Sequence, residues 1–310
     1  MYRTILVPLD GSKLAEQALP LALAVARRAH ANLRLARVHR PTASGGRTLP
    51  SKGVAASELA YVEAIADAAR RTGLPVETTL LEGPVPAALC KHAQAVNASL
   101  MVLTTHGRGP LSRFWLGSTA DDLVRRTPVP LLIHRPDPAG DPQAGTPLPP
   151  NADFRFRRVL VPLDGSDVAE EALGPAAEMA RIMGADLTFL RVVEPVPLVV
   201  PDGLVYTPPT LDTALMDDLT AQARNYVGHA AARWEGEGLD VETRVMVNDA
   251  PAAAVLEAAE GHDLIALATH GRSRMARLFL GSVADKVVRG AHCPVLVVRH
   301  PHTRPEGGKP

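Results

Sequence analysis

Short apolar runs alternate with longer amphipathic stretches along most of this chain. Runs such as residues 4–9, 100–104 and 158–163 are mostly apolar, as expected of strands that are covered on both faces of a sheet. The stretches between them predict amphipathic helices. Because regular alternation of strands and helices is typical of a parallel sheet with right-handed crossovers, the pattern predicts an α/β fold.

The alternation runs through the chain twice, with five expected strands in each half. In the first half we expect strands at residues 4–9, 33–38, 76–81, 100–104 and 130–134, and helices at residues 14–29, 54–71, 85–94 and 118–126. In the second half we expect strands at residues 158–163, 186–192, 241–245, 264–268 and 294–299, and helices at residues 169–183, 213–235, 250–259 and 282–289. Five strands per half favour two tandem doubly wound open sheets of five parallel strands each over a closed barrel.

An internal repeat supports this division. The segment Ile-Leu-Val-Pro-Leu-Asp-Gly-Ser at residues 5–12 returns almost unchanged at residues 159–166. The predicted domains are residues 1–135 and 154–300, joined by a proline-rich linker at 136–153 and followed by a flexible tail at 301–310. A second proline-rich stretch, residues 195–209, has no counterpart in the first half. We interpret it as an insertion in the second half.

Composition narrows the function classes. The 33 basic and 33 acidic residues cancel, so there is no electrostatic case for nucleic-acid binding. No stretch approaches the roughly 20 apolar residues of a membrane span, and the chain starts directly in a strand with no room for a signal peptide. Cys90 and Cys293 stand at unmatched positions, which favours free thiols in a reducing cytoplasm. The expected location is therefore cytoplasmic, with no membrane association.

A glycine-containing loop follows the fourth expected strand of each half. The loops span residues 103–118 and 267–282, and each leads through Gly-Ser into a helix. Glycine allows close approach of backbone to a ligand, and a helix N-terminus offers unpaired N–H groups to a phosphate. Ser118 and Ser282 could cap these helices or donate a hydroxyl to an anion.

The first strand of each half ends at an aspartate, Asp10 or Asp164. Open sheets bind ligands at the carboxyl ends of strands where the strand order reverses, so these aspartates would face the same crevice as the glycine loops if the first and fourth strands are neighbours. There they could bond a ribose hydroxyl or an adenine amino group. The alternative is a turn or N-cap residue ahead of the first helix.

The histidine and the arginine of each loop have two possible roles. His106 and His270 could take part in catalysis, but no partner stands at a defined spacing, and a turn histidine is the simpler interpretation. Arg108 and Arg272 could reach a phosphate or lie in solvent. The sequence holds no P-loop, no complete dinucleotide-binding glycine motif and no zinc-type cysteine spacing, so we assign no metal site and no catalytic residues.

Together, Pro-x-Asp-Gly-Ser after a strand and Thr-His-Gly-Arg followed by Leu-Gly-Ser resemble the universal stress protein family over both halves. The chain is similar to a tandem two-domain member with the adenine nucleotide alpha hydrolase-like fold. The family's nucleotide-binding pattern is Gly-x-x-Gly, nine residues, then Gly-Ser or Gly-Thr. The second glycine and the Gly-Ser pair are present in each half, but Thr104 and Ala268 replace the first glycine.

The resemblance implies two adenine-nucleotide sites that bind ATP, with Mg²⁺ on the phosphates as an option. In the first half it assigns Pro8, Asp10, Val38, Gly107, Arg108, Gly117, Ser118 and Thr119. In the second half it assigns Pro162, Asp164, Val192, Gly271, Arg272, Gly281, Ser282 and Val283. Since alanine is smaller than the β-branched threonine, we expect the second site to bind at least as well as the first.

Three functions remain open at this point. The leading one is a stress-response protein that binds ATP and acts through its conformation or through protein partners. The others are a nucleotide-free interaction or regulatory protein, and a slow ATPase whose base would come from Asp10, Asp164, His106 or His270. The resemblance also implies that the last strands of the halves, residues 130–134 and 294–299, pair within the chain as a pseudo-dimer, which could pair again as a homodimer.

Overall fold

The computed structural model describes residues 2–39, 52–105, 117–135, 154–196, 198–199, 205–206, 213–269 and 281–299. The first half contains β1 (Thr4–Pro8), α1 (Lys13–Glu16), α2 (Ala18–Ala29), β2 (Asn32–His39), α3 (Lys52–Arg70), β3 (Val76–Glu82), α4 (Val85–Ala95), β4 (Leu100–Thr104), α5 (Ser118–Arg126) and β5 (Leu131–His134). The second half contains β6 (Arg158–Leu163), α6 (Asp167–Glu170), α7 (Leu173–Met183), β7 (Asp186–Val193), β8 (Leu198–Val199), β9 (Val205–Tyr206), α8 (Thr213–Glu235), β10 (Val241–Val247), α9 (Pro251–Ala258), β11 (Leu264–Thr269), α10 (Ser282–Gly290) and β12 (Val295–Arg299).

Each half has five parallel strands, which confirms the predicted fold class. The order is β3-β2-β1-β4-β5 in the first half and β10-β7-β6-β11-β12 in the second. All pairings among these five strands of each half are parallel, including β1 with β4 and β6 with β11. The strand order therefore reverses between the first and fourth strands of each half, and this is the edge where open α/β sheets bind their ligands.

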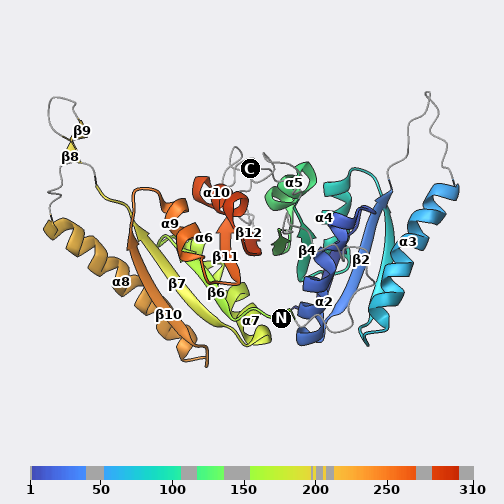
Figure 1. Cartoon of the computed structure of the whole chain (residues 1–310), viewed down its shortest axis with the longest axis horizontal. Helices are drawn as coiled ribbons and strands as arrows, with labels where there is room; N and C mark the ends of the chain where they lie inside the picture. Colours follow the sequence, from blue (N-terminus) through green and yellow to red (C-terminus); the bar gives the residue numbers. More distant parts are fainter. Residues whose placement is uncertain are drawn as a thin grey trace, which may run out of the picture.

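The two sheets join into one sheet of ten strands (Figure 1). β5 and β12 pair antiparallel, with Leu132 opposite Leu296 and Ile133 opposite Val295. The predicted pairing of the last strands within one chain is thus present, and it makes a continuous sheet where the sequence suggested two separate ones. At the N-terminus, between the halves, Tyr2 Oη donates a hydrogen bond to the carbonyl of Pro175 at 3.0 Å.

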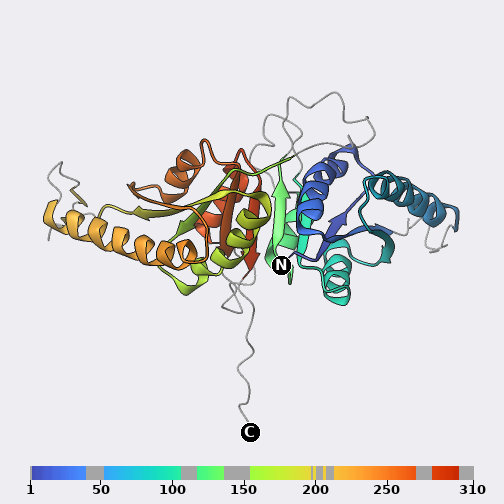
Figure 2. The ribbon, with the colours of Figure 1, turned by 90° about the horizontal axis from the view of Figure 1, so that it is seen from below.

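Helices cover both faces of the sheet, as Figure 2 shows from a second direction. Strand side chains alternate between two cores, so Ile5 and Val7 of β1 pack on one face and Leu6 on the other. The first core also takes buried residues from α2, α3, α7 and α8, and the second takes them from α4, α5, α9 and α10. Because both faces are buried at the middle of the sheet, β1, β4, β11 and β12 are apolar at most positions, whereas the edge strands β3 and β10 carry exposed polar residues.

The first helix of each half is broken, which corrects the prediction of single helices at residues 14–29 and 169–183. α1 ends at Glu16 and α2 begins at Ala18; α6 ends at Glu170 and α7 begins at Leu173. A proline follows each break, Pro20 in α2 and Pro175 in α7. Proline lacks an N–H and its ring clashes with the carbonyl four residues earlier, so each helix divides at that point.

Within the insertion at residues 195–209, β8 and β9 form an antiparallel pair that the sequence did not predict. The predicted linker at 136–153 and the tail at 301–310 lie outside the described residues. The same holds for residues 106–116 and 270–280, which include most of both glycine loops.

Candidate functional site

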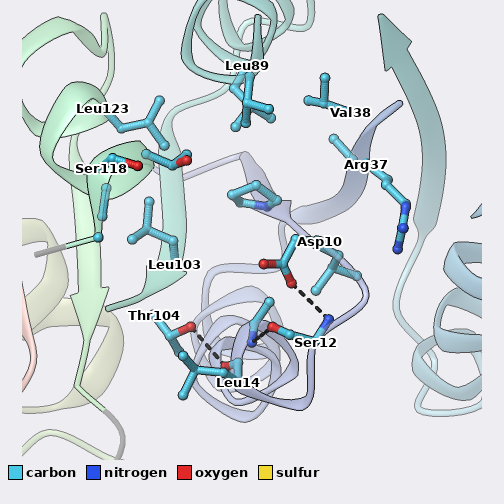
Figure 3. Close-up of a pocket in the computed structure, with 18 of the residues that line it drawn as sticks. Asp10, Ser12, Leu14, Arg37, Val38, Leu89, Leu103, Thr104, Ser118 and Leu123 are labelled. Carbon is cyan, nitrogen blue, oxygen red and sulfur yellow. Dashed lines mark hydrogen bonds between the residues drawn. The ribbon is translucent and has the colours of Figure 1, made fainter. Parts of the chain in front are cut away.

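A cavity of about 770 Å³ lies at the point of the first half where the strand order reverses (Figure 3). It is lined by Pro8, Leu9, Asp10, Ser12, Leu14, Ala15, Ala36, Arg37, Val38, Glu58, Val85, Leu89, Leu103, Thr104, Gly117, Ser118, Thr119, Ala120 and Leu123. Six of the eight residues assigned to the first site from the sequence are in this set. The other two, Gly107 and Arg108, lie outside the described residues.

Asp10 is both a turn residue and a wall of the cavity. Its Oδ1 accepts a hydrogen bond from the N–H of Ser12 at 2.9 Å, and Ser12 Oγ accepts one from the N–H of Ala15 at 3.1 Å, capping α1. The turn interpretation of this aspartate is therefore correct. It does not compete with ligand contact, since the carboxylate lines the cavity and can accept more than one donor.

One position in this turn, Gly11, restricts which residue can stand there. Gly11 has φ +86°, a left-handed conformation that favours glycine. A Cβ at Gly11 would lie 2.3 Å from Arg37 Nη1, so the guanidinium is packed directly against the turn. The turn and the end of β2 are thereby held together at one side of the cavity.

Thr104 shows why the missing first glycine does not strain the first half. It is the last residue of β4, and its Oγ1 donates a hydrogen bond to the carbonyl of Leu14 at 2.9 Å. Among the described non-glycine residues, positive φ occurs at His30 and Asn97, so neither Thr104 nor Ala268 needs the left-handed region. β-branched residues are favoured in strands, and Thr104 fits its place.

The opposite side of the cavity is the N-terminus of α5. Gly117 is the N-cap residue, with φ −56° and ψ 148°, and no side chain caps the helix. Gly281 starts α10 with nearly the same angles, φ −52° and ψ 147°, again without a side-chain cap. Ser118 and Ser282 are therefore first helical residues, which corrects the expectation that they might be caps. Both helix starts leave N–H groups for an anion.

A charged cluster that the sequence analysis did not single out borders the first cavity. Glu58 on α3 accepts hydrogen bonds from Arg37 Nη2 at 3.0 Å and pairs with His39 Nδ1 at 2.6 Å. Burial raises the pKa of the Glu58 carboxyl, but the hydrogen bonds from His39 and Arg37 outweigh it and lower the pKa overall. Arg37 also lies over the ring of Tyr61, 5.3 Å from its centroid.

Alternation along β2 carried a partial signal for this cluster. Arg37 and His39 are two residues apart and so share a face of the strand, while Val38 points to the other. Their partner Glu58 is on α3, and the pairing depends on how that helix packs against the strand. The sequence gives no register for that packing.

The second half repeats part of this geometry. Asp164 Oδ1 accepts hydrogen bonds from the N–H and Oγ of Ser166 at 2.9 and 2.6 Å. Tyr226 Oη donates to Glu170 as Tyr61 Oη donates to Glu16. The described site residues of this half, Pro162, Asp164, Val192, Gly281, Ser282 and Val283, stand at the same places on the same elements, whereas Gly271 and Arg272 lie outside the described residues.

The charged cluster of Glu58, Arg37 and His39 is not repeated in the second half. Tyr226 on α8 corresponds to Tyr61 on α3, and in this alignment Ala223 stands where α3 has Glu58. On β7, Val193 stands where β2 has His39. Both of these residues are buried. The arginine is kept as Arg191, and its side chain makes no hydrogen bond to another described residue. The two halves therefore differ beside the expected ribose position.

Neither cysteine offers an activated thiol. Cys90 and Cys293 are free and partly buried, and burial raises the pKa of both, that of Cys293 to about 11. Within the described residues no group of three or more histidine, cysteine or acidic side chains is arranged to hold a metal ion. The histidines considered for catalysis, His106 and His270, lie outside these residues.

No helix in the described part of the chain is long and apolar enough to cross a membrane.

Comparison with known proteins agrees with this geometry. The chain is 31% identical over 203 residues to a universal stress protein of Mycobacterium tuberculosis; the match covers 65% of this chain and 62% of that protein's length. It is 34% identical over 154 residues to a universal stress protein of Methanocaldococcus jannaschii, covering 49% of this chain and 86% of the relative. The crystal structure of a universal stress protein from Archaeoglobus fulgidus superposes with a TM-score of 0.64 at 20% identity, covering 96% of this chain and 97% of that one, which shows a shared fold.

The sequence model of the universal stress protein family matches this chain twice, at residues 1–135 and 155–299. The two matches account for both halves of the sheet and for both turns and helix starts described above. The chain therefore belongs to the universal stress protein family and carries two tandem domains of it.

Proposed function

We propose that this protein binds ATP or a closely related adenine nucleotide in the cavity of the first half and at the equivalent position of the second. The observation that carries the proposal is the cavity of about 770 Å³ that joins the Asp10 turn to the uncapped start of α5. Its size falls within the range of small-molecule sites, roughly 300–1,000 Å³.

The lining of the cavity suits the three parts of a nucleotide. Apolar side chains, including Val38, Leu89 and Leu103, offer a surface for a flat base. The Asp10 carboxylate can accept hydrogen bonds from ribose hydroxyls. The N–H groups at Ser118 and Thr119 stand at the positive end of a helix dipole, where phosphate is stabilised. Gly107 and Arg108 are proposed as further phosphate contacts on the strength of the family resemblance, as are Gly271 and Arg272 in the second half.

Magnesium would enter this site on the phosphates of the nucleotide and would neutralise part of their charge. Asp10 and Asp164 follow the first strand of each half, and each accepts hydrogen bonds within its own turn. Each carboxylate still has lone pairs that could accept a ribose hydroxyl or a water, so these bonds do not decide between binding and hydrolysis. A binding protein, which acts in the cytoplasmic stress response through its conformation or through partners, is preferred to a slow ATPase because both halves carry phosphate-type helix starts and the motifs assign no catalytic constellation.

Calorimetric titration of nucleotide-free protein with Mg-ATP tests the proposal. We expect saturable binding, with about two sites per chain if both halves are competent. Gly117→Val and Gly281→Val each place a branched side chain at one helix start, in backbone that any residue can adopt. Each variant should remove the binding of its own half. Absence of binding in the wild-type chain would favour a nucleotide-free interaction protein, and steady phosphate release would favour the ATPase.

A further inference from the structure

The two helices that begin at the expected phosphate sites approach each other where the halves join. α5 starts at Ser118 in the first half and α10 starts at Ser282 in the second. In Figure 1 they flank the junction made by β5 and β12. A contact between these helices would link the two nucleotide sites directly.

Four charged side chains make that contact, and we name them the junction cluster: Asp121 and Arg125 on α5, and Asp285 and Arg289 on α10. Arg125 binds Asp121 with two hydrogen bonds, from Nε at 2.8 Å and from Nη2 at 3.0 Å. Arg289 donates from Nε to its own Asp285 at 2.9 Å and from Nη2 across the junction to Asp121 Oδ1 at 3.1 Å. Arg289 thus donates hydrogen bonds to one carboxylate in each half.

The carboxylates of the cluster lie one helical turn from the phosphate sites. The N–H of Asp121 bonds the carbonyl of Gly117 at 2.9 Å, and the N–H of Asp285 bonds the carbonyl of Gly281 at 2.9 Å. Arg135, at the end of the first half, holds the far end of α10 through hydrogen bonds from Nη1 to the carbonyls of Arg289 and Ala291 at 2.8 and 3.2 Å. The backbone of Arg289 is therefore held from the first half, while its guanidinium is shared between Asp285 and Asp121.

Sharing of Arg289 makes the two sites compete for positive charge. A phosphate at Ser118 brings negative charge to the start of α5 and repels the carboxylate of Asp121 unless cations compensate it. If Arg289 is drawn towards Asp121, Asp285 loses part of its own compensation. A phosphate at Ser282 then meets a more negative helix start. A phosphate at Ser282 disfavours one at Ser118 to the same extent, as linkage between binding sites requires.

We propose that Arg289 couples the two nucleotide sites negatively, so that ATP in one half lowers the affinity of the other half by about fivefold. This inference rests on the proposed function. The expected size is at the low end of coupling between sites because Arg289 and Asp121 keep 25% and 31% of their side-chain surface exposed, where salt and water screen their charges.

The coupling can be measured by titrating the full chain with Mg-ATP. Gly281→Val and Gly117→Val give the association constant of each half with the other half disabled. For independent sites, the overall constant of the wild-type protein equals the product of these two constants. We expect the measured value to fall about fivefold below that product.

Asp121→Asn tests the assigned residue, and Asp122→Asn is its matched control. Asp122 is the next residue on α5 and carries the same charge, but it pairs with Arg126 of its own helix at 3.3 Å. Asp121→Asn is placed in the wild type and in both single-site variants. It should restore an overall association constant equal to the product of the two single-site constants, whereas with Asp122→Asn the overall constant should stay about fivefold below that product. If Asp121→Asn fails to fold, Arg289→Gln tests the same link from the other helix and should give the same loss.

The outcomes separate the coupling from the function on which it rests. A wild-type constant equal to the product, or a deficit that persists in Asp121→Asn, would overturn the coupling and leave nucleotide binding intact. Binding at one half alone would likewise overturn the coupling. No binding of ATP in any variant would remove both the proposed function and this inference.

Discussion

Thr104 at the end of β4 donates a hydrogen bond from Oγ1 to the carbonyl of Leu14, at 2.9 Å, across a sequence separation of 90 residues. This bond attaches α1, which follows the Asp10 turn, to the strand that leads into the glycine loop. It stands where the family pattern has glycine. The substitution in this chain therefore supplies a contact that glycine could not make.

Thr104→Val should remove this hydrogen bond while keeping the shape and strand preference of the side chain. We expect the free energy of unfolding to fall by about 1 kcal/mol, because the part-buried carbonyl of Leu14 loses a donor. Thr104→Ser keeps the hydroxyl and serves as the control. Urea unfolding measures both variants; a Thr104→Val protein as stable as the wild type would show that this hydrogen bond contributes nothing to stability.

Gly11 and Gly165 provide a matched pair for the turn that ends the first strand of each half. Both have left-handed backbone, φ +86° and +81°, so alanine should destabilise either position by roughly 1 kcal/mol. At Gly165 the added Cβ meets open space, whereas at Gly11 it lies 2.3 Å from Arg37 Nη1. Gly11→Ala should therefore displace Arg37 and weaken its bond to Glu58.

Unfolding free energies of Gly11→Ala and Gly165→Ala measure this difference, since the backbone strain is common to both. We expect the larger loss in Gly11→Ala. A crystal structure of that variant should show the guanidinium of Arg37 moved away from the turn. Equal losses with Arg37 unmoved would mean that its packing against the turn contributes nothing to stability.

Much of this architecture follows from local sequence, because apolar runs identify strands that are buried on both faces and the repeated Asp-Gly-Ser turn marks equivalent positions. Asp10 and Ser118 were expected at one crevice for that reason, and the family resemblance added Val38; all three line the cavity of the first half. The breaks before Pro20 and Pro175 also had a local signal, since each proline removes a helix hydrogen bond. A continuous amphipathic pattern outweighed that signal in the prediction.

Contacts between distant elements had no such signal. Glu58 meets Arg37 because α3 packs on β2 in one particular register. Arg289 meets Asp121 because β12 pairs with β5, which brings α10 beside α5. Charged residues at helical spacing are most often solvated, so neither pair stands out in the sequence. The Glu58–Arg37 pair is also where the two halves differ, and the Arg289–Asp121 pair is where they meet.

The pairing of β5 with β12 should carry a large share of the stability of the junction. Leu132 and Leu296 are opposite one another in the ladder, and neither side chain is exposed. Leu296→Ala should lower the free energy of unfolding by about 2–5 kcal/mol, the range for truncating a buried leucine. Val247→Ala, on the edge strand β10 where the side chain is 51% exposed, should cost less than about 0.5 kcal/mol. Similar losses in the two variants would contradict a tightly packed junction.

His134, the last residue of β5, should make the stability of the protein depend on pH. Its Nδ1 is buried without a hydrogen-bond partner among the described residues, and burial lowers the pKa of the imidazole. The unfolded chain has a histidine pKa of about 6.5, so the unfolded state binds the proton first as the pH falls. The free energy of unfolding should therefore decrease below pH ~6.5 and level off once the pH passes the lower pKa of the folded state.

Burial also lowers the pKa of His92 and His262, so they contribute in the same direction. His134→Gln should accordingly make the acid loss of stability shallower without abolishing it. His229→Gln, which removes a histidine from the exposed face of α8, is the matched control. The readout is the slope of unfolding free energy against pH between about 5 and 7, so a loss of stability common to all pH values does not affect it. A slope that His134→Gln leaves as steep as in the wild type would show that folding does not lower the pKa of His134.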